Sequence, residues 1–580
     1  MNRIQYLINA CIGLLLAAAV TSCEGLLNME PEDTLSPSTY FSNKTQLELW
    51  TNQFYSQFDE ADELADISAD DLVDNSMGTV LMGTRTAADE NGWSWTQLRK
   101  INYYLQNSKN CKDEGDRAQY DGVAYFMRAY FYWIKVRRYG DVPWYNQVLN
   151  SDSDDLLFKP RDDRGLVMDS IMVDLDRAVD LLPSKKDVLH VTKWTALALK
   201  SRVALYEGTW RKYRNMDNAD KYLKLAAEAG ENFIDKSGYS IYSSGDTPYR
   251  DFFNSLDAIE TETILAKKYS EEAIVRHGIP FWIINQRPGF TKRFMNHYLM
   301  ADGTRFNDVS DWETMDYVAE TTNRDSRMAQ TVLCPGYIQV GATDVSANDL
   351  TALTGYRPIK YVGNSMYDGA DKAITDYPLF RAAEVYLNFA EAKAELGTLT
   401  QADLDKSINK IRARVNMPAL DMAEANANPC PLMSEYYPNV TKSAYTGVIL
   451  EIRRERTIEL VMEGFRMWDM FRWKEGQQFT KPFYGCYFPG LGEYDMDADG
   501  VNDLLLYSDN KGGFKGVTMK VGKDLVLTDG TSGYIHANHS IPITWNEERD
   551  YLWPIPASER VLTGGILTQN PGWVDTTNFD

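Results

Sequence analysis

Residues 121–138 read DGVAYFMRAYFYWIKVRR, and this stretch sets the character of the fold. Its apolar side chains recur every three or four residues, which places them on one face of an α-helix. They are Val123, Phe126, Met127, Tyr130, Phe131, Ile134 and Val136. Gly140 and Pro143 follow, and both residue types commonly end a helix. The stretch predicts a long helix with a buried aromatic face.

Similar patterns on both sides of this stretch predict further helices. They cover residues 166–182, 191–207, 219–233, 382–396 and 401–415, with a break at Gly208 between the second and third. Two successive pairs, 191–233 and 382–415, place alanine beside a bulky aromatic residue at close-packing positions, as tetratricopeptide hairpins do. We therefore predict a mainly α fold built on a scaffold of tetratricopeptide-like helical hairpins.

Three long segments have a different composition from the helices. Residues 60–95, 236–376 and 476–580 are rich in Gly, Asp, Asn, Ser and Tyr and contain short runs typical of strands. Loops of this length in a compact protein usually serve a function. We expect them to form a loop-rich, partly β face that binds a ligand.

The N-terminal residues resemble a secretory signal peptide. Residues 1–22 contain Arg3 and an apolar run, and Cys23 follows directly. The run is too short to span a bilayer comfortably, and a signal that ends at a cysteine resembles that of a bacterial lipoprotein. We expect residues 1–22 to be removed, Cys23 to carry the lipid anchor, and residues 23–37 to form an acidic tether. The alternative is an ordinary secretory signal in which Cys23 occurs by chance.

Charge and cysteine content exclude some classes of function. The net charge is −23, from 60 basic and 83 acidic residues, which argues against nucleic acid as a partner and against electrostatic docking on anionic lipid. Besides Cys11 and Cys23 the chain has four cysteines, widely spaced and without a CxxC motif, so no metal knuckle is indicated.

Specific strings distributed along the chain carry a family resemblance. They are YFMRAYFY (125–132), YGDVP (139–143), VDLDRA (173–178), FRAAEVYL (380–387), RRERTIEL (453–460), EGFRMWDMFRW (463–473), PIP (554–556) and QNPGW (569–573). Together with the lipoprotein signal, this ordered series resembles the SusD/RagB family of outer-membrane nutrient-binding lipoproteins. By this resemblance residues 38–235 form an N-terminal helical region, and residues 236–580 form a C-terminal region that carries the ligand-binding insertions.

The resemblance also implies a function, a place and a partner. It implies a lipid-anchored protein exposed on the outer membrane, which binds an oligosaccharide or polysaccharide and acts as the lid of a SusC-like TonB-dependent barrel. In the RagB branch the ligand is a peptide, and this alternative stays open. A surface glycoside hydrolase is the other alternative, but the catalytic motifs HExxH, GxSxG and GxxxxGK[ST] do not occur in the sequence. We expect a binding protein and not an enzyme.

Two loop stretches are the candidate ligand-binding segments. Sugar recognition needs flat aromatic faces with polar side chains beside them, and by the resemblance both stretches line the ligand site. The first contributes Asp71, Arg85 and Trp93, with Trp95 assigned to the core. The second contributes Trp282, Arg287 and Phe290. For each aromatic residue the alternative is ordinary packing in the core.

The segment DMDADGVND, residues 495–503, resembles the start of a calcium loop. Asp495, Asp497 and Asp499 stand at alternate positions before Gly500, and Asp503 follows. The twelfth position is Leu506, where an EF-hand has glutamate, and no helices are predicted on either side. A structural Ca²⁺ site and a plain acidic turn both fit this pattern.

The block at residues 453–463 is predicted to be scaffold. Its charged residues lie at helical separations while Ile458, Leu460 and Val461 are apolar. We expect Arg456 and Glu459 or Glu463 to form an inward-facing ionic cluster, and Arg128 and Arg381 to serve the same structural purpose.

Overall fold

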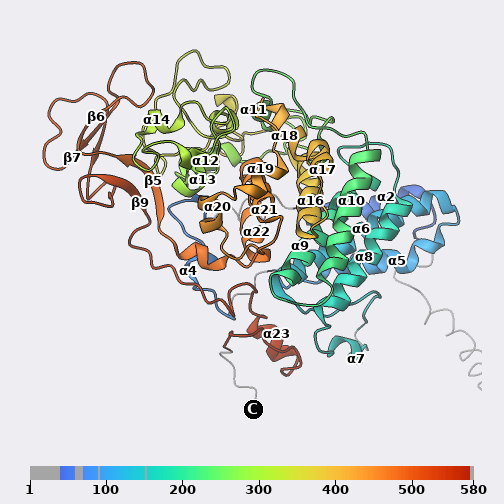
Figure 1. Cartoon of the computed structure of the whole chain (residues 1–580). Helices are drawn as coiled ribbons and strands as arrows, with labels where there is room; N and C mark the ends of the chain where they lie inside the picture. The colour runs from blue at the N-terminus through green and yellow to red at the C-terminus, as the bar shows by residue number, and fades with distance from the viewer. Residues whose placement is uncertain (1–39, 59–68, 89–91, 151–152, 575–580) are drawn as a thin grey trace, which may run out of the picture.

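The structure is a computed structural model that describes residues 40–58, 69–88, 92–150 and 153–574 (Figure 1). The predicted signal, Cys23 and the acidic tether lie outside these residues. Within the described part, no helix is both long and apolar enough to cross a bilayer. Cys111, Cys334, Cys430 and Cys486 are buried free thiols.

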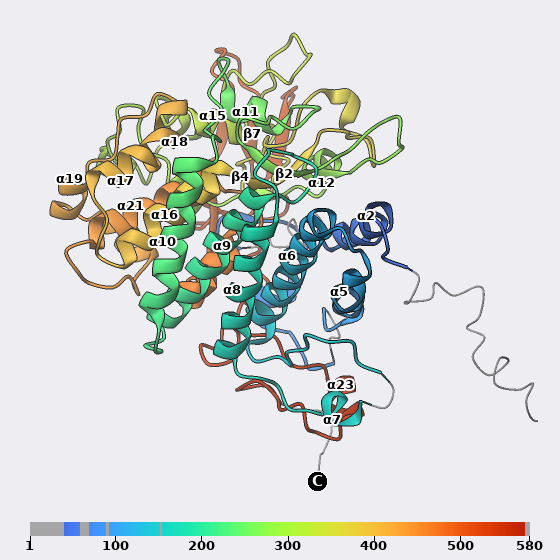
Figure 2. The ribbon, with the colours of Figure 1, turned by 90° about the vertical axis from the view of Figure 1, so that its right-hand side faces the viewer.

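Long helices form one half of the molecule, as predicted. Figure 2 shows α6, α8, α9, α10 and α16 side by side, with α2 and α5 on one flank. Their bounds are α2 Lys44–Asn52, α5 Thr96–Asn107, α6 Glu114–Tyr139, α8 Arg164–Leu181, α9 Lys193–Lys212, α10 Ala219–Lys236 and α16 Ala382–Glu395. Helices α18 (Ile408–Arg414) and α21 (Thr446–Glu459) contact α16, α22 (Arg466–Arg472) contacts α9, and α17 (Gln401–Lys406) contacts α18.

Helix α6 is the predicted central helix and begins earlier than the apolar pattern does. The Asp113 carboxylate accepts a hydrogen bond from the Asp116 backbone N–H at 2.9 Å, which caps the first turn. Gly140 ends the helix with a φ of 71°, a conformation that glycine adopts without strain. Phe126, Met127 and Tyr132 are fully buried.

Two predicted helix boundaries are wrong. Gly208 lies inside α9 and does not break it. A Cβ atom there would lie 2.7 Å from Leu223 Cγ, so the missing side chain allows α10 to approach α9 closely. The predicted helix over 401–415 is divided at Ser407, whose backbone (φ −127°, ψ −92°) is not helical, into α17 and α18.

In the described residues, the other half of the molecule consists of loops, short helices and four small sheets. Strand β1 (Leu72–Val73) pairs with β3 (Gly289–Phe290), β2 (Thr263–Lys267) with β4 (Tyr377–Arg381), and β5 (Phe483–Phe488) with β9 (Gly533–Ala537), all antiparallel. Strands β6 (Gly492–Tyr494), β7 (Leu504–Tyr507) and β8 (Val517–Lys520) form a three-stranded sheet at the edge farthest from the long helices (Figure 1).

The short helices lie mostly in the connections of this half. They are α4 Thr79–Met82, α7 Asp154–Leu157, α11 Pro248–Phe253, α12 Ile279–Asn285, α13 Lys292–Met295, α14 Tyr317–Thr321, α15 Arg327–Thr331, α19 Met422–Ala427, α20 Pro431–Tyr436 and α23 Ala557–Leu562. One cluster of buried apolar residues runs from Phe41 to Leu567, so the core is continuous across the boundary predicted at residue 235.

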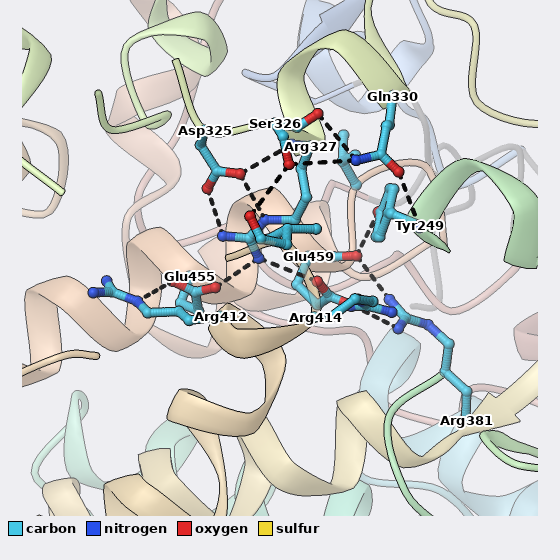
Figure 3. A network of polar contacts seen from close by, with 12 residues as sticks. Tyr249, Asp325, Ser326, Arg327, Gln330, Arg381, Arg412, Arg414, Glu455 and Glu459 are labelled. Carbon is cyan, nitrogen blue, oxygen red and sulfur yellow. Dashed lines mark hydrogen bonds and ion pairs between the residues drawn. The ribbon is translucent and has the colours of Figure 1, made fainter. Parts of the chain in front are cut away.

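A buried ionic network joins the two halves (Figure 3). Arg327, on α15, bonds Asp325 and Glu455, both at 2.6 Å, and Glu459 at 3.2 Å. Arg381, at the end of β4, bonds Glu459 at 2.7 Å. Because these groups are almost fully buried, each charge depends on its partners for stabilisation.

The predicted cluster exists, but with different pairs. Arg456 bonds Asp469 at 2.7 Å, and no bond joins it to Glu459 or Glu463 among the described contacts. Glu463 instead bonds Arg381 at 2.7 Å and Lys360 at 2.6 Å. The helical spacing correctly predicted that these side chains point into the protein. It could not predict their partners, because those lie on other segments.

Candidate functional site

The two predicted ligand-binding stretches meet in space. Strands β1 and β3 place Leu72 opposite Phe290 and Val73 opposite Gly289. Beyond the strands, the Asn75 side-chain amide donates to the Gln286 backbone oxygen at 3.3 Å. The loops after β1 and before β3 are therefore held side by side.

Asp71 and Phe290 face the interior at this junction. The Phe290 side chain is fully buried and stacks on Phe294 with 4.5 Å between ring centroids. The Asp71 backbone oxygen accepts a hydrogen bond from the Thr291 N–H at 2.9 Å, and burial raises the pKa of its carboxyl group to about 7. The neighbouring Asp70 bonds Arg466 through both carboxylate oxygens at 2.6 Å. These residues anchor the junction to the core.

Arg85 lies in a buried cage made by the C-terminal segment. Its Nη2 donates to the Asp550 backbone oxygen at 2.6 Å. The guanidinium lies over the rings of Trp553, at 4.5 Å, and Trp573, at 5.4 Å. In this conformation Arg85 joins the loop after α4 to residues near the C-terminus.

Trp282 and Arg287 lie nearer the surface. Trp282 is half-buried on α12, and Arg287 is exposed just after that helix. The Arg287 Nε donates to the Thr351 backbone oxygen at 2.5 Å, which ties this loop to its neighbour. Neither residue lines the cavity of about 400 Å³ that is described next.

Trp93, in contrast, lines a surface cavity of about 400 Å³. The walls come from the start of α5, the loop after α6, and the region of α7 and α23, which lie together at the lower end of the helical half (Figure 2). The polar and aromatic residues of the lining are Trp93, Trp95, Thr96, Arg99, Asn102, Tyr145, Gln147, Glu559 and Thr563.

The aromatic rings of the cavity form a connected group. Trp95 packs edge-on against Trp93, with ring centroids 5.4 Å apart, and against Tyr145, at 5.8 Å. Trp93 is 5% exposed, while Trp95 is half-buried and so presents more of its ring to the cavity. The assignment of Trp95 to the core is therefore incomplete, because this ring also lines the surface cavity.

Hydrogen bonds fix the polar side of the cavity. The Asn102 amide donates to the backbone oxygens of Tyr145 and Gln147 at 3.0 and 3.2 Å. Its oxygen accepts from Arg128, which in turn bonds Asp174 through two oxygens at 2.7 and 2.8 Å. This chain of bonds holds the Tyr145 loop against α5, and it explains why Arg128 stands in the middle of an aromatic helix.

Sequence reasoning did not select Tyr145, Arg99, Asn102 or Gln147. The only signal for Tyr145 was an aromatic pair, Trp144 and Tyr145, directly after Pro143. Asn102 and Arg99 lie three residues apart on α5, and side chains at this spacing share one face of a helix. Only the position of the loop after α6 shows that this face lines a cavity.

The acidic loop between β6 and β7 brings three of its four predicted carboxylates together. Oxygen atoms of Asp495, Asp497 and Asp503 lie within 4.8 Å of one another. Burial and the neighbouring carboxylate of Asp503 raise the pKa of Asp497. The Asp499 carboxylate is outside this group and accepts the Val501 N–H at 2.7 Å. The Ca²⁺ site stays a prediction, with Asp499 apart from the other three.

Comparison with known proteins gives the family. A model described as SusD family matches residues 286–573, and one described as starch-binding associating with outer membrane matches residues 33–205. SusD-like protein P38 of Formosa agariphila is 23% identical over 529 residues, which cover 83% of this chain and 93% of that protein.

Solved structures agree with this result at the level of the fold. A SusD-like carbohydrate-binding protein from Bacteroides fragilis has a TM-score of 0.68 at 20% identity, with 90% of this chain and 99% of that chain covered. A crystal structure with xylogluco-oligosaccharide has a TM-score of 0.60 at 18% identity, with 92% and 99% covered. The two models and the curated relative together account for both halves of the molecule, and the chain belongs to the SusD/RagB family.

Proposed function

We propose that this chain is a lipid-anchored protein of the outer-membrane surface that binds oligosaccharide and delivers it, as a lid, to a SusC-like TonB-dependent barrel. The family models and the descriptions of the relatives support binding of carbohydrate and association with the outer membrane. The lipoprotein-like signal that ends at Cys23 supports the anchor. The barrel and the lid movement are implied by the family.

The observation that carries the binding proposal is the aromatic cavity beside α5. Trp95 and Tyr145 offer ring faces for the CH groups of a sugar, and Arg99 and Gln147 offer donors and acceptors for its hydroxyls. A volume of about 400 Å³ lies in the range of small-ligand pockets. A stacked ring contributes only about 0.5–1.5 kcal/mol beyond its buried area, so the rings must act together.

The lining of this cavity favours binding over hydrolysis. Glycoside hydrolysis uses two carboxyl groups placed on either side of the scissile bond. Among the described residues that line the cavity, Glu559 is the one carboxylate. A ligand held here would therefore be bound without the acid and base pair that cleavage needs.

The test is binding of a glycan panel to the purified protein and to three variants. We expect Trp95→Ala to weaken capture of the preferred oligosaccharide about tenfold, because a stacking face is lost. Trp282→Ala examines the second predicted stretch in the same way. Trp312→Ala is the matched control, because that half-buried ring packs on Phe306, outside the cavity.

Each outcome has a defined meaning. Retention of glycan without new reducing ends, lost in the Trp95 variant, supports the proposal. Loss only in the Trp282 variant moves the site to α12, and new reducing ends indicate a hydrolase. Retention of peptides instead of glycans indicates the RagB-like alternative. Failure to co-purify a TonB-dependent barrel from native outer membranes would contradict the lid role.

A further inference from the structure

A second cavity lies in the loop-rich half, away from the aromatic cavity beside α5. It has a volume of about 260 Å³, and its lining shares no residue with the first cavity. The walls come from the residues after α11, the start of α12, and the loops around residues 340 and 363–375. All lining residues in the described chain are uncharged.

Asn254 lines this second cavity, and its side-chain amide forms no hydrogen bond within the described part of the protein. Asn254 follows α11, and both its Nδ2 and its Oδ1 are buried with no hydrogen-bond partner among the described residues. Leaving a buried amide unpaired costs stability, and native structures rarely do so without a reason. A Cβ atom on Gly363 would lie 3.3 Å from the Asn254 oxygen, so this glycine keeps the space beside the amide open.

The rim of the cavity is apolar and exposed. Leu256, Val340 and Met366 are 45%, 43% and 67% exposed. The rim loops are held together by Gln339, whose Nε2 donates to the Gly363 backbone oxygen at 3.1 Å and to Asp368 at 2.8 Å. The apolar rim is therefore a defined part of the fold, and large exposed apolar groups of this kind commonly mark binding sites.

We propose that this cavity binds an N-acetylated amino sugar through Asn254. An asparagine amide presents a donor and an acceptor side by side. The acetamido N–H of such a sugar can donate to Oδ1 while the adjacent ring hydroxyl accepts from Nδ2. The acetyl methyl group then lies against Leu256, Val340 or Met366. A sugar without the acetyl group buries less apolar surface there and binds more weakly.

The chemistry of the cavity distinguishes this ligand from a short peptide. The charged ends of a short peptide would meet no charged side chain in the lining of the described residues. A sugar carries its amide as a pendant group without charge. That the ligand is a sugar rests on the proposed glycan-binding function. That the ligand carries a group able to hydrogen-bond an amide rests on Asn254 alone.

The test compares two disaccharides that differ in their acetamido groups. The full-length protein in detergent is titrated with N,N′-diacetylchitobiose and with cellobiose. We expect the acetylated sugar to bind at least about fourfold more tightly, the effect of one additional buried methyl group. Asn254→Leu, which keeps the γ-branched shape and removes the amide, should weaken its binding about tenfold.

Two controls separate the amide from general damage to the fold. Asn254→Leu should not lower the melting temperature, because the amide that it removes has no partner in the protein. Asn285→Ala should leave binding unchanged, because that exposed amide on the neighbouring helix α12 already donates to the Phe281 backbone oxygen at 2.8 Å.

Several results would overturn the inference. They are equal affinity for the two disaccharides, acetylated-sugar binding that Asn254→Leu does not change, or tighter Asn254-dependent binding of N-acetyl-leucinamide. Trp95→Ala should leave diacetylchitobiose binding intact. If other glycans bind in a Trp95-dependent manner while diacetylchitobiose does not bind, this inference fails alone; if no glycan binds at all, the proposed function fails with it.

Discussion

Replacement of Arg381 by methionine tests whether the buried ionic network holds the loop-rich half to the helices. Arg381 is 2% exposed, and its guanidinium bonds Glu262 at 2.9 Å, Glu459 at 2.7 Å and Glu463 at 2.7 Å. Methionine retains much of the volume but leaves three buried carboxylates without this cation. Removal of one partner from a buried pair typically costs 3–5 kcal/mol, so we expect a loss of about 3–5 kcal/mol in the free energy of unfolding.

The matched control is Arg276→Met. Arg276 bonds Glu271 at the surface, where the carboxylate is 67% exposed, so we expect a change of about 0–1 kcal/mol. Urea unfolding and calorimetry of both variants give the comparison. If Arg381→Met costs no more than Arg276→Met, the carboxylates are satisfied by Arg327, Arg414 and Lys360, and the reasoning is refuted.

The pH dependence of the Arg381 effect gives an independent check. The cations Arg414, Arg381 and Arg327 overcome the effect of burial and hold the pKa of Glu459 at about 2, below its ordinary value of 4.5. This stabilisation is present above about pH 4.5 and is lost as the pH falls towards 2. In the variant the carboxylates protonate more readily, so its deficit relative to the wild type should shrink in acid.

Three further predictions follow from other groups. Burial raises the pKa of Asp71 in the folded protein to about 7, above its ordinary 3.8, so its contribution to stability is greatest below about pH 4 and is lost as the pH rises to about 7. Urea unfolding of Asp71→Asn should therefore depend less on pH between 4 and 7 than that of the wild type. An unchanged pH profile would contradict the burial effect assigned to Asp71. If Ca²⁺ binds the loop at Asp495, Asp497 and Asp503, EGTA should lower the melting temperature of the wild type, because Ca²⁺ at one hundred times its Kd contributes about 2.7 kcal/mol to stability. The melting temperature of Asp497→Ala should not change with EGTA. If EGTA does not shift the wild type either, the loop is a plain acidic turn. Cys23→Ala should release the protein from the outer membrane with its glycan affinity unchanged, as measured by fractionation and titration, and a loss of affinity would show that the anchor does more than hold the protein.

The helical half could be predicted because its signals are local. In α6 the apolar spacing gives the helix and its buried face, and Gly140 gives its end. Gly208 misled the prediction because a glycine can either end a helix or allow a neighbouring helix to approach, and only the position of Leu223 on α10 decides between the two.

The ligand-binding residues could be predicted only in part. The two stretches around Asp71 and Trp282 were selected as aromatic loops, and the structure brings them together through β1 and β3. Within them, Phe290 is fully buried while Trp95 lines a surface cavity, although both are aromatic residues in similar local sequence. The exposure of a loop side chain depends on what packs over it, which local sequence does not encode.

By itself the sequence determined the helical scaffold and the strings by which the family is recognised, and it predicted a lipoprotein signal that ends at Cys23, because each depends on residues close together in the chain. The tertiary structure decided the rest: the partners of Arg456 and Glu459, the cavity between α5 and the C-terminal helix α23, and the unpaired amide of Asn254. Each of these depends on contacts between different helices, strands or loops, or on the space left between them. Non-local packing sets those distances, and a linear pattern of residue types cannot report them.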